Sequence, residues 1–143
     1  MMKRVLGIDV GDARVGLAIS DEAGMLAHAL ETVTVRQTDP VRRIREVCES
    51  KNVGTIVIGL PRNMDGSNGP AAEKSRAFAE KVRSITSAEI VLWDERMTTV
   101  AAHRALREVG RDVRSGRKVI DQLAAQMILQ GWMDAQSMLE CSD

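Results

Sequence analysis

Residues 55–59, Thr-Ile-Val-Ile-Gly, form a short continuous run of apolar character that is followed by a loop rich in Gly, Pro and Asn. A strand with one face in water alternates apolar and polar residues, whereas a strand buried on both faces reads as a continuous apolar run. The run therefore predicts a strand within a sheet that has helices on its faces. The chain's 143 residues suffice for a single domain, 1–143, with a substantial core.

The elements around this strand predict a mixed sheet. Strands are expected at 4–10 and 14–20, joined by a tight Gly11-Asp12-Ala13 hairpin, and then at 27–35 and 89–93. Helices are expected at 40–51, 70–85, 98–109 and 118–135. Three strands in a meander, followed by strand–helix–strand units with right-handed crossovers, give the strand order 3-2-1-4-5. The predicted fold class is α/β, with a five-stranded mixed sheet and helices on both faces.

Asp121 interrupts the apolar pattern of the last predicted helix. At about 100° per residue, the apolar face of this helix holds Ala124, Ala125, Ile128 and Trp132. Three glutamines, at 122, 126 and 130, lie opposite, and Asp121 falls on the apolar face. A carboxylate that faces a core is destabilising unless a cation, a metal or hydrogen bonds meet it. Asp121 is therefore expected to have such a partner.

Two further acids are expected at one edge of the sheet. Asp9 lies near the end of the first strand, and Glu95 follows the fifth strand, directly after Asp94. Functional residues gather at the carboxyl ends of the strands in open α/β sheets, so Asp9, Glu95 and Asp121 are expected to converge. Clustered carboxylates repel one another unless a cation is bound, and oxygen-only ligands favour Mg²⁺ or Mn²⁺. Such sites commonly hold two ions about 4 Å apart for in-line phosphodiester cleavage.

Each acid also has a simpler explanation. Asp9 could cap a turn, and Glu95 could form a surface ion pair with the adjacent Arg96. Asp121 could cap its helix near the N-terminus or pair with Arg117.

The charge of the chain is zero overall but unevenly distributed. Residues 96–118 contain seven basic side chains and two acidic ones, which can mark an anion-binding surface. Arg104, Arg107 and Arg111 share one side of the helix predicted at 98–109, opposite its apolar side. This arrangement favours phosphate contacts, with an ordinary solvated helix face as the alternative.

The cysteine positions and the hydropathy of the chain indicate where in the cell the protein is expected. Cys48 falls on an apolar helix face and Cys141 in the tail, so the two make no disulfide or zinc pattern. Free thiols of this kind predict a reducing, cytoplasmic location. No long apolar run or signal-peptide pattern predicts membrane association.

Four motifs, taken together and in order, resemble the YqgF/RuvX family. They are Gly7-Ile8-Asp9-Val10-Gly11 with Arg14 and Gly16, Gly59-Leu60-Pro61 with Met64-Asp65-Gly66-Ser67, Asp94-Glu95-Arg96 with Thr98-Thr99, and Lys118 with Asp121, Ala124 and Ala125. The resemblance covers nearly the whole chain and implies an RNase H-like fold related to Holliday junction resolvases. It also implies a bacterial nuclease that processes the 5′ end of pre-16S rRNA or resolves DNA junctions. By motif, the family's acidic triad carries over to Asp9, Glu95 and Asp121.

One feature departs from the resolvase relatives. In those relatives an acid usually closes the fourth strand, where this chain has Gly59-Leu60-Pro61. The second carboxylate is expected instead at Glu95, after the fifth strand. Asp9 would bind the principal metal ion, and Glu95 and Asp121 would complete its ligation.

Candidate substrate contacts surround the acids. The loop at 60–69 could follow the substrate backbone, or it could be an ordinary connection in which Ser67 or Asn68 caps the next helix. The expected contacts to substrate are Arg14, Arg62, Asn63, Ser67, Arg96, Arg104, Arg107 and Lys118.

The expected function is metal-dependent hydrolysis of phosphodiester bonds in structured nucleic acid, either an rRNA precursor or branched DNA, by a monomer or homodimer. Two other classes stay open. One is a nucleic-acid-binding regulator that keeps the fold without turnover. The other is an ATP-handling protein, because Gly-Ile-Asp-Val-Gly before a hairpin also resembles the first phosphate motif of actin and sugar-kinase folds. Those folds place ATP between two such domains, and this chain supplies one.

Overall fold

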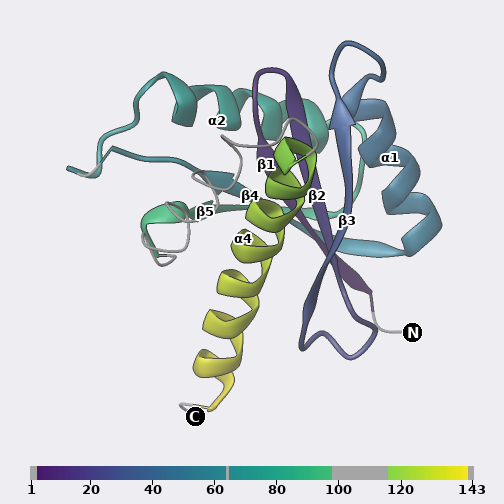
Figure 1. The fold of residues 1–143 in the computed structure, drawn as a ribbon. Coiled ribbons are helices and arrows are strands. Elements are labelled where there is room, and N and C mark those ends of the chain that lie inside the picture. The colour runs from purple at the N-terminus through teal and green to yellow at the C-terminus, as the bar shows by residue number, and fades with distance from the viewer. Residues whose placement is uncertain (1–2, 64, 98–115, 142–143) are drawn as a thin grey trace.

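The computed structural model describes residues 3–63, 65–97 and 116–141 (Figure 1). The helix predicted at 98–109, and with it Arg104, Arg107 and Arg111, lies outside the described residues.

The sheet has five strands in the predicted order. They are β1 (Arg4–Val10), β2 (Arg14–Ser20), β3 (Ala27–Thr34), β4 (Val53–Leu60) and β5 (Glu89–Asp94), arranged as β3-β2-β1-β4-β5. The first three strands are antiparallel neighbours, whereas β4 runs parallel to both β1 and β5. The carboxyl ends of β1, β4 and β5 therefore meet at one edge, as the sequence predicts.

Helices cover both faces of this sheet. In Figure 1, α4 (Gly116–Cys141) crosses one face, and α1 (Pro40–Lys51) and α2 (Pro70–Arg83) lie on the other. The predicted start of α1 is confirmed, because the Asp39 side chain accepts a hydrogen bond from the Val41 amide at 3.1 Å. The alternative in which Ser67 or Asn68 caps α2 is not what the structure shows. Its cap position is Gly69, with no capping side chain, and Pro70 opens the helix without an amide to satisfy.

Strand β1 divides its side chains between two cores. Leu6 and Ile8 are fully buried in the core under α1 and α2, whereas Val5 packs against the smaller core under α4. Gly7 faces α4 as well, because a Cβ atom there would lie 2.6 Å from the Cβ of Leu129. Close approach of α4 to β1 thus requires a glycine at this position.

The buried face of α4 differs from the predicted one by about one residue. Ala125, Ile128, Leu129 and Met133 are the buried positions, and Trp132 is only partly buried. The glutamines predicted on the opposite face contact the sheet instead. Gln126 Nε2 donates to the Ala27 carbonyl at 2.9 Å, and Gln130 Oε1 accepts from the Ala27 amide at 2.8 Å. Ala27 belongs to the edge strand β3, whose unpaired backbone groups these amides satisfy.

No helix in the described part of the chain combines the length and apolar character needed to cross a membrane.

Candidate active site

Asp9 lies at the carboxyl end of β1, one residue before the strand ends, and is partly buried. Its register partner in β2 is Gly16. Because Leu6 and Ile8 face α1 and α2, the alternation of the strand puts Asp9 on the α4 face. The side chain therefore stands at the edge of the sheet, on the face that α4 covers.

Asp121 reaches this edge from α4 because β2 has a glycine there. A Cβ atom at Gly16 would overlap the backbone carbonyl oxygen of Asp121, so any larger residue would push the helix away. The side chain of Asp121 accepts a hydrogen bond from Arg14 Nε at 2.6 Å, and both side chains are mostly buried. The partner that this acid is expected to have is thus Arg14. Asp121 is not the cap of its helix, because α4 begins at Gly116.

Glu95 reaches the same face from the other side. It follows β5 and opens the short 3-10 helix η1 (Glu95–Met97). A Cβ atom at Gly59 would lie 2.5 Å from Glu95 Oε1 and 2.5 Å from Ile128 Cδ1 of α4. The Glu95 carboxylate therefore occupies the space above the end of β4 where a side chain at Gly59 would otherwise stand.

The three acids consequently lie on one face and one edge of the sheet. Asp121 stands over β2, Asp9 on β1 and Glu95 over β4, and adjacent strands are about 4.8 Å apart. Among the described residues, however, no three Asp, Glu, His or Cys side chains are close enough to share a metal ion. Arg14 compensates the charge of Asp121 at this position, so the carboxylates need not converge to be stabilised. The donor chemistry fits a hard divalent cation, which would meet Arg14 as a competitor at Oδ2 of Asp121.

Asp94 forms ion pairs with two of the arginines that are expected to contact phosphates, Arg62 and Arg96. Arg96 donates to both carboxylate oxygens of Asp94, from Nη2 at 2.7 Å and from Nε at 3.1 Å. These hydrogen bonds hold the pKa of the Asp94 carboxyl below its ordinary value. Arg62 Nη1 lies 3.9 Å from the same carboxylate, and its Nε is buried with no hydrogen-bond partner in the described part of the chain. Arg96, the residue proposed as a surface ion-pair partner of Glu95, forms an ion pair with Asp94.

The loop between β4 and α2 uses its polar side chains internally. Asn63 Nδ2 donates to Ser67 Oγ at 3.0 Å, and Ser67 donates from its amide and its hydroxyl to Asp65 Oδ1. Gly66, at φ 89°, turns the loop and lies against the guanidinium of Arg96. Asn63 and Ser67 therefore shape the loop, and the cationic side chain beside it is Arg96.

Three proposed contacts lack a described side chain. Arg104 and Arg107 lie outside the described residues, and Lys118 is placed only as part of the backbone of α4.

A family model with the description "RuvX: Holliday junction resolvase" matches residues 3–135. The chain belongs to the RuvX family. This confirms the family that the motifs around Asp9, Gly59, Glu95 and Asp121 indicate.

Curated RuvX-family relatives are similar over almost their full length. A protein of Acetivibrio thermocellus with the name "Putative pre-16S rRNA nuclease" is 46% identical over 136 residues, which is 93% of this chain and 96% of the relative. A protein of Halalkalibacterium halodurans with the same name is 44% identical over 138 residues, 94% of this chain and 99% of the relative.

Solved structures confirm the fold. Thermus thermophilus RuvC in complex with a Holliday junction substrate matches with a TM-score of 0.59 and 15% identity, over 95% of this chain and 96% of that one. A second structure of Thermus thermophilus RuvC matches with a TM-score of 0.55 and 15% identity, over 94% of this chain and 96% of that one. At this identity the likeness establishes the resolvase-type RNase H-like fold of this RuvX-family chain.

The role of Asp94 as an anchor was not predicted from the sequence. Its position directly before Glu95 at a strand end was visible, but the pairing with Arg62 depends on the neighbouring strand β4.

Proposed function

We propose that this RuvX-family chain is a metal-dependent nuclease whose catalytic residues are Asp9, Glu95 and Asp121. One observation carries the proposal. Two glycines on the strands that flank β1, Gly16 and Gly59, leave room for Asp121 and Glu95 on the same face as Asp9. A fold needs glycine at both positions if carboxylates from distant segments are to stand beside the central strand.

The metal ion is part of the proposal. Mg²⁺ or Mn²⁺, as two ions when substrate is bound, would polarise the scissile phosphate and activate water. Asp9 would be the shared ligand because it lies between the other two acids, which would complete the ligation. Arg14 would leave Asp121 as the ion binds and would then be available to a phosphate of the substrate.

The cationic side chains at this edge fit a nucleic-acid backbone. Arg62 and Arg96 lie around Asp94, just beyond the ends of β4 and β5. Asp94 limits the freedom of both guanidinium groups, so less conformational entropy is lost when a phosphate binds. We propose that Arg104, Arg107 and Lys118, which follow in the chain, also contact substrate phosphates.

We infer that the natural substrate is structured RNA, the 5′ end of pre-16S rRNA. The relatives that are 41–46% identical over at least 93% of this chain have names that state this substrate class. The four-way DNA junction is the second candidate, because the matching RuvC structure contains one.

A cleavage assay separates these substrates. Purified wild-type chain is incubated with precursor 16S rRNA and with a four-way DNA junction, each with Mg²⁺, with Mn²⁺ and with chelator. Metal-dependent cleavage of the precursor at its 5′ side, with none by Asp9→Asn, is expected. Binding of either substrate without cleavage under every condition would instead identify a non-catalytic regulator.

A further inference from the structure

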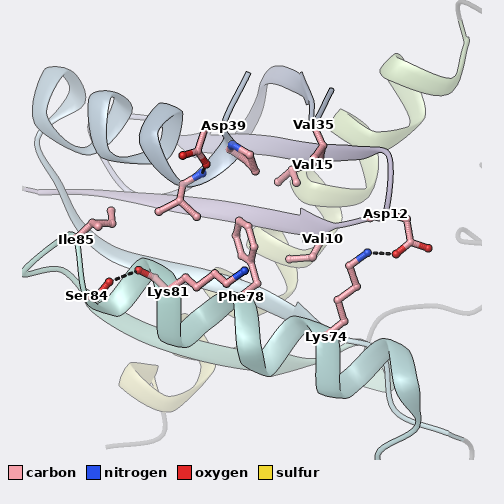
Figure 2. Close-up of a pocket in the computed structure, with 13 residues that line it drawn as sticks. Val10, Asp12, Val15, Val35, Asp39, Lys74, Phe78, Lys81, Ser84 and Ile85 are labelled. Carbon is pink, nitrogen blue, oxygen red and sulfur yellow. Dashed lines mark hydrogen bonds and ion pairs between the residues drawn. The ribbon is translucent and has the colours of Figure 1, made fainter. Parts of the chain in front are cut away.

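A hollow lies on the face of the sheet opposite to Asp121. It has a volume of about 570 Å³, within the range of small-molecule sites. It is formed by the end of β1, the start of β2, the residue after β3, the start of α1 and one side of α2 (Figure 2). Its apolar lining includes Val10, Val15, Val35, Phe78 and Ile85. Val35 is 38% exposed, so water is in contact with apolar surface here.

The α2 side of this hollow is cationic. Lys74, Phe78 and Lys81 line it at successive turns of α2, and Figure 2 shows Lys81 running along the helix toward Phe78. Lys74 pairs with Asp12 of the β1–β2 hairpin, but Asp12 is almost fully exposed, and such pairs contribute little stability. Lys81 makes no ion pair with any residue in the described part of the chain. An anion could therefore bind Lys81 directly and compete for Lys74.

The hollow connects to the edge that carries the acids. Val10 and Gly11 line it and follow Asp9 directly in the chain. A second hollow of about 370 Å³ shares Val10, Gly11, Asp12 and Lys74 and extends to Pro70 and Ala71 at the start of α2. Together the two form one trough that passes between the hairpin and α2 at the carboxyl end of β1.

We propose that this trough binds a nucleotide of the substrate strand next to the scissile phosphate, with its base against Phe78 and its phosphate on Lys81 and Lys74. The ligand must combine a flat apolar group with an anion, because the lining combines an aromatic ring and aliphatic side chains with two ammonium groups. A nucleotide supplies both, and a base stacks on an aromatic side chain whatever its identity. The proposal rests on the proposed function, since the strand that enters the trough is the one that crosses the edge beside Asp9.

Binding is tested in chelator, so that no cleavage is required. The probes are a fluorescein-labelled single-stranded RNA 10-mer, followed by anisotropy, and adenosine 5′-monophosphate. Amide chemical shifts of Val10, Val35 and Ile85 report occupancy of the trough for both. The variants are Lys81→Gln and Phe78→Leu, with circular dichroism to check the fold. Arg76→Gln is the matched control, because Arg76 is exposed on α2 but does not line the trough.

The 10-mer is expected to shift the three reporter amides. Phe78→Leu should weaken its binding on the order of tenfold, and Lys81→Gln should weaken it and lower the salt slope by up to about 0.7. Arg76→Gln should change the affinity less than either. Unmoved reporter amides, or equal weakening by Arg76→Gln, would overturn the proposal. Shifts that the monophosphate causes and the 10-mer does not would also overturn it, since they would assign the trough to a free nucleotide.

Failure of the trough proposal can be told apart from failure of the proposed nuclease function. A wild-type chain that binds the 10-mer in the trough but cleaves no substrate with any metal would overturn the nuclease and leave the trough assignment standing.

Discussion

Arg14 Nε lies 2.6 Å from Asp121 Oδ2 and joins β2 to α4 across 107 positions of sequence. The pair places a fixed positive charge on one of the three acids that the family resemblance identifies as metal ligands. A cation that binds Asp121 through Oδ2 competes with this guanidinium as well as with water. The pair also meets the requirement that a carboxylate on the inner side of a helix has a partner.

Arg14→Gln tests this competition. In chelator the variant should melt a few degrees below wild type, because Asp121 loses its ion pair. Added Mg²⁺ or Mn²⁺ should then raise its melting temperature more than that of wild type, because the ion no longer competes with Arg14. Thermal melts across a metal titration measure both effects.

Arg43→Gln is the control for that experiment. Arg43 pairs with Glu31 at 2.6 Å, with similar exposure, but the pair joins α1 to β3 away from the acids. It should lower stability without changing the response to metal. An identical metal response in Arg14→Gln and wild type would show that the ion does not compete with Arg14 for Asp121.

Asp9→Asn separates catalysis from binding. The amide keeps the shape of the side chain and removes its charge, so cleavage should fall below detection while affinity for the substrate in chelator stays within a few-fold. Glu95→Gln and Asp121→Asn should act alike, and their combination should cost little more, because the acids work as one unit. Asp134→Asn, on an exposed part of α4, is the control. Cleavage at the wild-type rate by Asp9→Asn would rule out the mechanism.

Gly59→Ala should lower activity more than stability. The nearest atoms to the added methyl group are the ends of two side chains, the Glu95 carboxylate, which can rotate away, and Cδ1 of the buried Ile128, which must shift within the core. Moving the Glu95 carboxylate should reduce cleavage severely, with a change in unfolding free energy of about 1 kcal/mol, at the low end of the cost of overpacking. Single-turnover cleavage and urea denaturation measure the two quantities.

Gly16→Ala should behave in the opposite way to Gly59→Ala. Its methyl group meets the backbone of Asp121, so α4 must move, at a cost of roughly 1–3 kcal/mol or more. If Gly16→Ala were as stable as wild type and Gly59→Ala were fully active, neither glycine would be needed for the site.

Asp94→Asn should lower stability in a pH-dependent way. Hydrogen bonds from Arg96 depress the pKa of Asp94 below the ordinary value of 3.8, so its stabilisation is present above that pH and is lost as the pH falls through the folded-state pKa. The variant should therefore melt about 1–4 °C below wild type at pH 7, and the difference should shrink only below about pH 4. Melts from pH 7 to pH 3 measure this. A difference that disappears already at pH 5 would show that the Arg96 hydrogen bonds to Asp94 are not its cause.

Most of the fold was predictable because its signals are local. Each of these signals determines the structure of only a few neighbouring residues. They are the apolar run at 55–59, the Gly11-Asp12-Ala13 turn and the Asp39-Pro40 helix start. The handedness of crossovers then leaves one strand order, which the structure confirms. The face of α4 was less predictable, because Gln126 and Gln130 contact an edge strand that periodicity alone does not place.

The sequence by itself determined the fold class, the family, the positions of Asp9 and Glu95 at strand ends, and the position of Asp121 on the last helix. Only the tertiary structure decided that Asp121 pairs with Arg14, that Glu95 fills the space above Gly59, and that Phe78 and Lys81 line a trough beyond Asp9. These relationships join segments far apart in the chain. They depend on how closely α4 and η1 approach the sheet, which is set by the absence of a Cβ atom at Gly16 and Gly59, on strands distant in sequence from Asp121 and Glu95.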